Sequence, residues 1–157
     1  MLKPPLPHSA IARRIPHQGS MCLLDQVLQW DDARIVCSAS SHHALDNPLR
    51  AHGRLGAACG VEYAAQAMAM HGALLGEAMA GAAAVPRAGY LASVRQLQLL
   101  VERLDLFPGR LTVCAERMTG DANNILYQFT VSADDQCLLS GRAAVVLDAG
   151  ALLSSRS

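Results

Sequence analysis

The sequence predicts an α+β domain in which a curved antiparallel sheet wraps around one long central helix. The first observation is the apolar stretch from Leu55 to Met79, which is rich in Ala, Met and Leu and contains no proline. Such a helix is apolar nearly all round and has to be buried. The second observation is that the flanking segments read as strands joined by short polar turns. One sheet can cover a buried helix only if it curls around it.

Two strands are expected before the helix, at 25–30 and 33–40, and the link Asp31-Asp32 favours a hairpin between them. The connection from 41 to 56 is long and polar, and connections of this kind are often functional. After the helix, short polar turns separate further expected strands, at 90–101, 110–118, 124–133 and 136–147.

The chain ends are expected to lie outside this domain. Residues 1–14 carry three prolines and are predicted to form an extended arm. Residues 148–157 are predicted to form a frayed tail. The domain itself is therefore assigned to residues 15–147, a length that suits one core.

Composition argues against several classes of function. The formal net charge is zero and the pI is near 7.0, so the basic excess of a nucleic-acid surface is missing. All basic residues except Lys3 are arginines, which suit forked contacts to phosphate or carboxylate. A membrane span is not expected, because four polar residues interrupt the helix: Glu62, Gln66, His71 and Glu77.

Cysteine usage indicates reduced, buried thiols rather than a disulfide framework or a zinc site. The chain has five cysteines, at positions 22, 37, 59, 114 and 137. Their number is odd, no CxxC pair occurs, and several of them lie in apolar runs. The first residues contain no apolar segment like that of a signal peptide. We therefore expect a cytoplasmic protein that uses neither metal nor cofactor.

Glu62 and Gln66 are the residues that packing alone does not explain. They lie four positions apart, so a helix brings them to one face. A carboxylate in an apolar helix is costly unless it is paired, protonated or in use. A structural alternative remains, in which Glu62 lies at a solvent-facing helix start and interacts with the helix dipole.

Five short motifs in order resemble the hot-dog fold, and more narrowly the bacterial 3-hydroxyacyl-carrier-protein dehydratases of the FabA/FabZ type. They are Ile15-Pro16-His17 with Met21–Val27, then Asp46–Leu49, Glu62–Ala67, Gly89–Val94 and Phe107–Gly109. The helix opening is also similar to that of the dehydratase-like hot-dog proteins of aryl-polyene clusters. The resemblance implies reversible loss of water from a 3-hydroxyacyl thioester of acyl carrier protein or coenzyme A.

The chain departs from that family in the loop before the helix. The family loop carries prolines and places the acid fourteen residues after a catalytic His, whereas Glu62 follows His52 by only ten. The resemblance implies Glu62 as the acid and His52 as the base, facing each other across a dimer interface. His43 is the alternative base. His42 and His43 can equally be exposed loop residues, and His17 a turn residue that binds backbone.

The reaction also needs donors for the thioester carbonyl, and helix N-termini supply unpaired amides. The expected donors are the N–H groups of Ala57 and Ala58, with Gln66 orienting Glu62 or a water molecule. Two rivals stay open. One is a non-catalytic hot-dog subunit that pairs with an active dehydratase, and the other is a hot-dog acyl thioesterase. We expect a homodimer, or a heterodimer with another hot-dog subunit, formed through the edge strand at 90–99.

Overall fold

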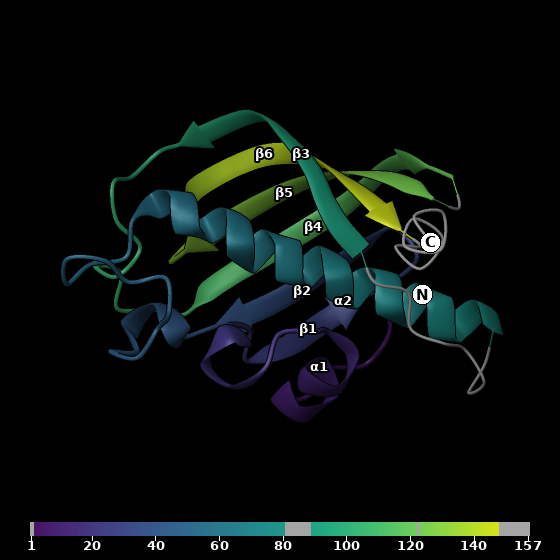
Figure 1. Ribbon diagram of the computed structural model, residues 1–157, viewed down its shortest axis with the longest axis horizontal. Helices are drawn as coiled ribbons and strands as arrows, with labels where there is room; N and C mark the ends of the chain where they lie inside the picture. The colour runs from purple at the N-terminus through teal and green to yellow at the C-terminus, as the bar shows by residue number, and fades with distance from the viewer. Residues whose placement is uncertain (1, 81–88, 122, 148–157) are drawn as a thin grey trace, which may run out of the picture.

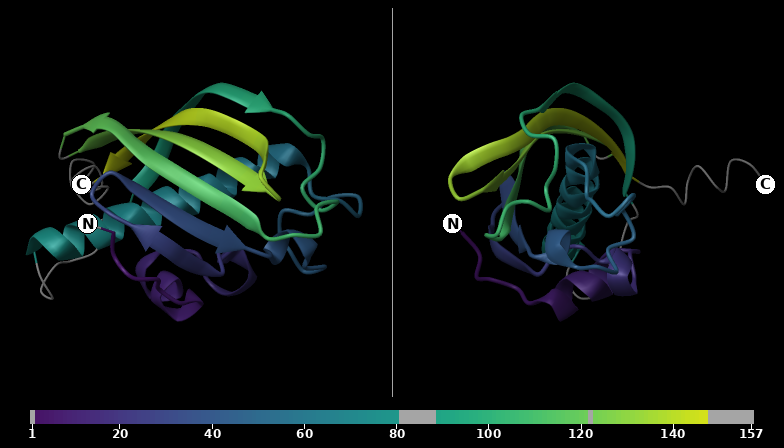
Figure 2. Two further views of the ribbon diagram at one scale, coloured as in Figure 1. Left: turned by 180° about the vertical axis from the view of Figure 1, so that it is seen from behind. Right: turned by 90° about the vertical axis from the view of Figure 1, so that its left-hand side faces the viewer.

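Six antiparallel strands form one sheet that curls around a long helix in the computed structural model, which describes residues 2–80, 89–121 and 123–147. Figure 1 shows helix α2 (Gly60–Ala80) running along the inner face of the sheet, and the end-on view of Figure 2 shows the sheet arching over it. The strands are β1 (Gln26–Trp30), β2 (Arg34–Ala39), β3 (Gly89–Leu99), β4 (Leu111–Gly120), β5 (Asn124–Ala133) and β6 (Gln136–Leu147). The predicted fold class is confirmed.

The strand order across the sheet is β1-β2-β4-β5-β6-β3, and every neighbouring pair is antiparallel. Alternation explains which face is buried: in β5, Ile125, Tyr127, Phe129 and Val131 point to the core, while the residues between them are more exposed. β3 lies at one edge of the sheet, next to β6. The strand that we expected at the edge is therefore an edge strand.

The helix packs closely against the sheet. A Cβ atom placed on Gly60 would lie 2.5 Å from Cδ2 of Leu139, so a larger residue here would require the Leu139 side chain to shift. One side of α2 is buried against the sheet, while a partly covered stripe on its other side contains Glu62, Ala65 and Ala69. This stripe is the part of the helix that a ligand can reach.

The N-terminus corrects the sequence prediction of an extended arm over 1–14. Residues 8–14 form helix α1 (His8–Arg14), which begins after Pro7. Ile11 is fully buried and Arg14 pairs with Glu77 at 3.0 Å, so α1 is fastened to the core and to α2. Only the residues before α1 are extended, and two of them form bridges to β1 at its outer edge, Lys3 with Trp30 and Leu6 with Val27.

The polar connection 41–56 packs against residues 100–110. It begins with the short 3₁₀ helix η2 (Ser41–His43) and ends just before the 3₁₀ turn η3 (Ala57–Cys59), which leads into α2. Leu104 donates its N–H to the carbonyl of Leu55, and Asp105 accepts from the N–H of Leu55. The tail expected at 148–157 and most of the link expected at 81–89 lie outside the described residues.

Candidate active site

His17 and Glu62 meet on the partly covered side of α2. Nε2 of His17 lies 3.0 Å from Oε1 of Glu62, and the two side chains are 25% and 34% exposed. Glu62 is held by the first turns of α2, whereas His17 belongs to the irregular segment between α1 and β1. Nδ1 of His17 is buried and has no partner among the described residues. The nitrogen that can exchange a proton is therefore Nε2, which faces the carboxyl.

A cavity of about 260 Å³ opens beside this pair. Apart from His17 and Glu62 its walls are apolar, and they come from the N-terminal segment, α2, β3 and β6: Pro16, Ala65, Ala69, Leu91 and Val145. Ala65 and Ala69 follow Glu62 by one and two helical turns, so the cavity extends along the helix. An acid–base pair thus stands in the wall of an apolar cavity.

Gln66 does not face this cavity. Its side chain is fully buried, its Oε1 accepts from the N–H of Leu23 at 2.9 Å, and its Nε2 donates to the carbonyl of Met21 at 2.7 Å. Both ends of the amide are therefore occupied by backbone. The expectation that Gln66 orients Glu62 or a water molecule stays a prediction, with no such contact of Gln66 in the described part of the chain.

Tyr63 and the start of the 41–56 connection support the same segment from a second side. The Tyr63 hydroxyl lies 2.7 Å from Oγ of Ser41 and accepts from Nδ2 of Asn47 at 3.1 Å. Ser41 in turn donates to the carbonyl of Leu23 at 2.8 Å. Burial raises the pKa of Tyr63, so this hydroxyl stays protonated and acts as a structural link.

In the structure of one chain, the histidines of the 41–56 connection do not line the cavity beside Glu62. His52 is exposed in the turn between Ala51 and Arg54, where its φ is 54°, and Glu62 contacts His17 instead. His43 is exposed and its Nε2 contacts the carbonyl of Phe107. Neither lines the cavity beside Glu62.

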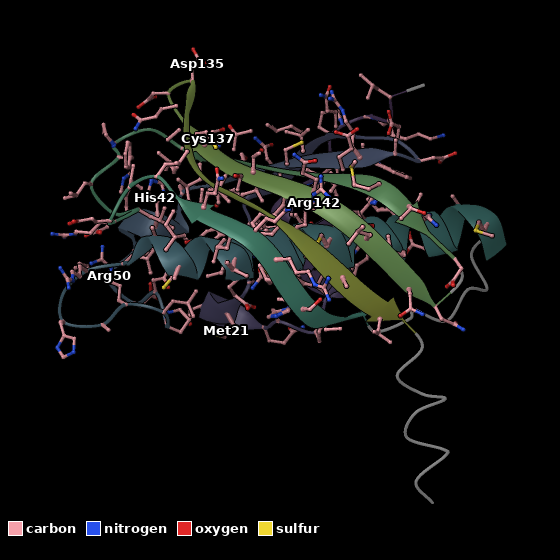
Figure 3. All side chains as sticks on the ribbon, turned by 90° about the horizontal axis from the view of Figure 1, so that it is seen from above. Met21, His42, Arg50, Asp135, Cys137 and Arg142 are labelled. Atoms are coloured by element: carbon pink, nitrogen blue, oxygen red, sulfur yellow. The ribbon has the colours of Figure 1, made fainter. Side chains whose placement is uncertain are left out.

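His42 is fully buried, which corrects the interpretation of it as an exposed loop residue. Its Nε2 donates to the carbonyls of Phe107 and Gly109, both at 3.0 Å. Burial, aided by the neighbouring His43, lowers the pKa of His42, so the ring is neutral at physiological pH. Figure 3 shows His42 and Arg50 at the end of the molecule where α2 begins.

The backbone N–H groups of Ala57 and Ala58, which we expected to polarise the thioester carbonyl, differ in whether they already have an acceptor. The N–H of Ala57 donates to the carbonyl of Glu102 at 3.0 Å, so it is not free. The N–H of Ala58 has no acceptor in the described part of the chain, and Ala58 is exposed. Neither residue lines the cavity. Ala58 alone remains available as a donor.

His71 is a structural residue of the helix. It is fully buried, with Nδ1 2.7 Å from the Tyr127 hydroxyl and Nε2 2.7 Å from the carbonyl of Asp31. The carbonyl of Asp31 can only accept, so Nε2 carries a proton, and a neutral ring then accepts the Tyr127 hydroxyl at Nδ1. Burial accordingly lowers the pKa of His71.

No group of three or more His, Cys, Asp or Glu side chains suited to hold a metal ion occurs in residues 2–80, 89–121 and 123–147. Over the same residues, no helix has the length and hydrophobicity to cross a membrane. The cysteines at 22, 37, 59, 114 and 137 are all free thiols.

The pairing of His17 with Glu62 was not predicted from the sequence. The signal that could have found it is the motif Ile15-Pro16-His17, which matches the family opening and directly precedes the segment held by Gln66. Sequence spacing relates neighbours on one element, and His17 and Glu62 lie on different elements.

The comparisons with known proteins agree on the fold. The model of the ApeP-like family, described as ApeP dehydratase, matches residues 9–154. Among solved structures, the dehydratase heterocomplex ApeI:P from Xenorhabdus doucetiae matches with a TM-score of 0.74 and 20% identity, covering 91% of each chain. A search of curated protein sequences finds no significant match.

Two further solved structures are also similar, at lower coverage. A mutant thioesterase from Pseudomonas aeruginosa gives a TM-score of 0.54 at 19% identity, covering 78% of this chain and 79% of that one. The PaaI protein of the E. coli phenylacetic acid degradation operon gives 0.56 at 12% identity, covering 76% of each. These likenesses show a hot-dog fold, and the match of the family model over nearly the whole sequence shows that the chain belongs to the ApeP-like dehydratase family.

Proposed function

We propose that this protein catalyses the reversible loss of water from a 3-hydroxyacyl thioester of acyl carrier protein or coenzyme A, giving the trans-2-enoyl thioester. The observation that carries the proposal is the contact of 3.0 Å between His17 and Glu62 in the wall of an apolar cavity. Dehydration needs one group that accepts a proton and one that donates a proton on the same small substrate. His17 takes the place that the resemblance gave to His52.

In the proposed step, Nε2 of His17 removes the proton at C2 of the substrate. The C2–H electron pair forms the C2=C3 double bond, and the hydroxyl at C3 leaves with a proton from the carboxyl of Glu62, as water. The reverse reaction adds water by the same two groups. The substrate has to lie in the cavity against both Nε2 and Oε1, because the two atoms act on adjacent carbons.

The apolar walls suit the acyl chain of such a substrate. Ala65 and Ala69 leave room along α2, and Leu91 and Val145 close the opposite side. We place the acyl chain along this stripe, away from the acid–base pair. The thioester carbonyl then lies toward the start of the helix, where the free N–H of Ala58, one turn before Glu62, supplies a donor.

A second hot-dog subunit is part of the proposal. β3 is an edge strand, and several of its leucines are partly exposed, among them Leu91, Leu97 and Leu99. An open edge strand is a ready site for pairing with another strand. The solved relative from Xenorhabdus doucetiae is a heterocomplex by its title, which supports a heterodimer beside the homodimer as the assembly.

The test is Glu62→Gln, with Glu77→Gln as the matched control on the same helix. Glu77 pairs with Arg14 and does not line the cavity. Glu62→Gln should abolish hydration of a crotonyl thioester, because an amide of the same shape cannot exchange a proton, while Glu77→Gln keeps the rate. Unchanged activity in Glu62→Gln would refute the assignment.

The same preparations separate the rival functions. Release of free thiol from an acyl thioester, without hydration, would favour the thioesterase, in which Glu62 activates water. The non-catalytic partner would be favoured by a different result. The unmutated protein would then show no hydration alone, and activity would appear only with a second hot-dog subunit whose own acidic residue is essential. Solution mass at micromolar concentration decides between monomer, homodimer and heterodimer.

A further inference from the structure

We infer that Gln66 is a positioning residue, which fastens the segment that carries His17 to the helix that carries Glu62. The inference deepens the proposed function, since it names what holds the acid–base pair together. It also predicts a change in His17 that can be measured without any activity.

The first ground is the pair of hydrogen bonds made by Gln66. They reach the N–H of Leu23 and the carbonyl of Met21, at 2.9 and 2.7 Å, across more than forty residues of sequence. Gln66 is fully buried, so water does not compete for either bond. A buried amide satisfied at both ends by one short stretch of backbone fixes the position and the direction of that stretch.

The second ground is what lies between this anchor and His17. The chain passes from His17 through Gly19, which has a φ of 60°, and the short 3₁₀ turn η1 (Gly19–Met21) before it reaches the anchored backbone. Apart from this turn, the chain between His17 and Met21 forms no helix or strand. The anchor at Met21 and Leu23 is therefore the nearest support on the C-terminal side of His17.

The third ground is the geometry of the helix. Glu62 and Gln66 lie four residues apart on α2, so one turn of a rigid element separates the carboxyl from the anchor. Glu62 faces the cavity and Gln66 faces the core. Helix α2 thus presents one member of the pair directly and sets the position of the other through Gln66. The Glu-x-x-x-Gln spacing serves catalysis and positioning together.

Two other side chains also bond the backbone that follows His17, but at positions beyond Met21. Ser41 donates to the carbonyl of Leu23, and Nδ1 of His8 lies 2.8 Å from the carbonyl of Leu24. Both act beyond Met21, farther from His17 along the chain. Among these contacts only Gln66 reaches Met21, and only Gln66 does so from the helix that bears Glu62.

A double-mutant cycle tests whether Gln66 acts through His17. Gln66→Met keeps the volume and flexibility of the side chain but removes both hydrogen bonds. It should lower kcat by up to about 100-fold, as misplacement of a catalytic group by about 1 Å does, with a smaller change in KM. In the His17→Ala background, Gln66→Met should lower the rate little further. Equal losses in both backgrounds would overturn the inference.

Gln66→Glu gives a second readout that a merely structural role would not produce. A protonated carboxyl offers one acceptor oxygen and one O–H donor, which is the pattern of the amide, whereas a carboxylate cannot donate to the carbonyl of Met21. The rate relative to the unmutated protein should therefore recover as the pH falls. Gln128→Glu, an exposed change on β5, is the control. A ratio that stays flat with pH would contradict the inference.

The third readout does not depend on activity. The imidazole NMR signals of His17, assigned by their loss in His17→Ala, should shift or broaden in Gln66→Met, while those of buried His71 stay in place. Unchanged His17 signals in a folded variant would overturn the inference. If the unmutated protein shows no hydration, the proposed function fails, and the imidazole signals still decide the role of Gln66.

Discussion

Two regions of the molecule carry histidines, and they differ in whether a histidine reaches the cavity beside Glu62. The segment from Pro16 to Leu24 places one histidine, His17, against the carboxyl of Glu62. The connection 41–56 carries three histidines and brings none of them to the cavity. The difference lies in what each region is fastened to.

The first region is held by α2 through Gln66, so its histidine shares a rigid frame with the acid. Tyr63 of α2 also bonds the second region, at Ser41 and Asn47. Its buried His42, however, is held by carbonyls of residues 100–110, and Asp105 accepts from the backbone near the end of the connection. Its histidines therefore serve the junction between two loops or point to solvent. The comparison teaches that the role of a histidine follows from the groups that surround its ring in the folded chain.

The largest expected effect separates His17 from the other histidines. His17→Ala should lower the hydration rate of a crotonyl thioester by about 10²–10⁴-fold, the usual contribution of a general acid or base. His43→Ala and His52→Ala should leave the rate close to that of the unmutated protein. A collapse in His52→Ala with an unchanged rate in His17→Ala would return the base to the loop, acting on Glu62 of a second subunit.

The next effect concerns the anchor of the second region. Oδ1 of Asp105 accepts from the N–H of Leu55 at 3.2 Å, and the Arg103 guanidinium grips both carboxylate oxygens. Asp105→Asn should lower the free energy of unfolding by about 1–3 kcal/mol, measured with urea, because a charge-assisted contact is lost. Asp46→Asn, an exposed change in the same connection, is the control.

The Arg103 guanidinium holds the pKa of the Asp105 carboxyl well below its usual range. A carboxyl whose folded pKa is lowered stabilises the fold above its unfolded pKa, near 3.8, and that contribution disappears as the pH falls through the folded value. The difference between Asp105→Asn and the unmutated protein should therefore shrink in strongly acidic solution. A difference that is independent of pH would contradict this account of the anchor.

A smaller effect is expected from the buried neutral histidines. Burial lowers the pKa of His42 and of His71, so the unfolded chain binds protons that the folded chain does not. Stability is then greatest above the unfolded value, near 6.5, and falls as the pH decreases from there toward the folded values. The free energy of unfolding should thus drop between neutral and mildly acidic pH. His71→Gln should reduce that slope, and an unchanged slope would speak against the neutral ring.

The smallest effect belongs to His52. Its ring is exposed and its backbone has a φ of 54°, so the side chain contributes little to the fold. His52→Gly should change the free energy of unfolding by less than about 0.5 kcal/mol, since glycine accepts this conformation without strain. A loss above that size would show that the turn Ala51–Arg54 takes part in the anchor at Asp105.

The sequence by itself determined the elements and one residue of the site. Periodicity and turn residues placed β2 and β4 to within two residues at each end, and β5 and β6 with the observed bounds. The apolar run around Glu62 identified the helix and its misplaced carboxyl, because local pattern carries both. The arm over 1–14 was misjudged, since its prolines stop at Pro7 and the following residues can form a helix that the core stabilises.

The tertiary structure decided which histidine meets Glu62 and what Gln66 does. His17 lies more than forty residues before Glu62, and Met21 and Leu23 lie more than forty residues before Gln66, so no local spacing relates these partners. Their approach depends on the sheet curling around the helix and on α1 and η1 packing at its open side. Long-range contacts of this kind follow from packing of the whole chain, so the partner of the Glu62 carboxyl is settled only when the fold is complete.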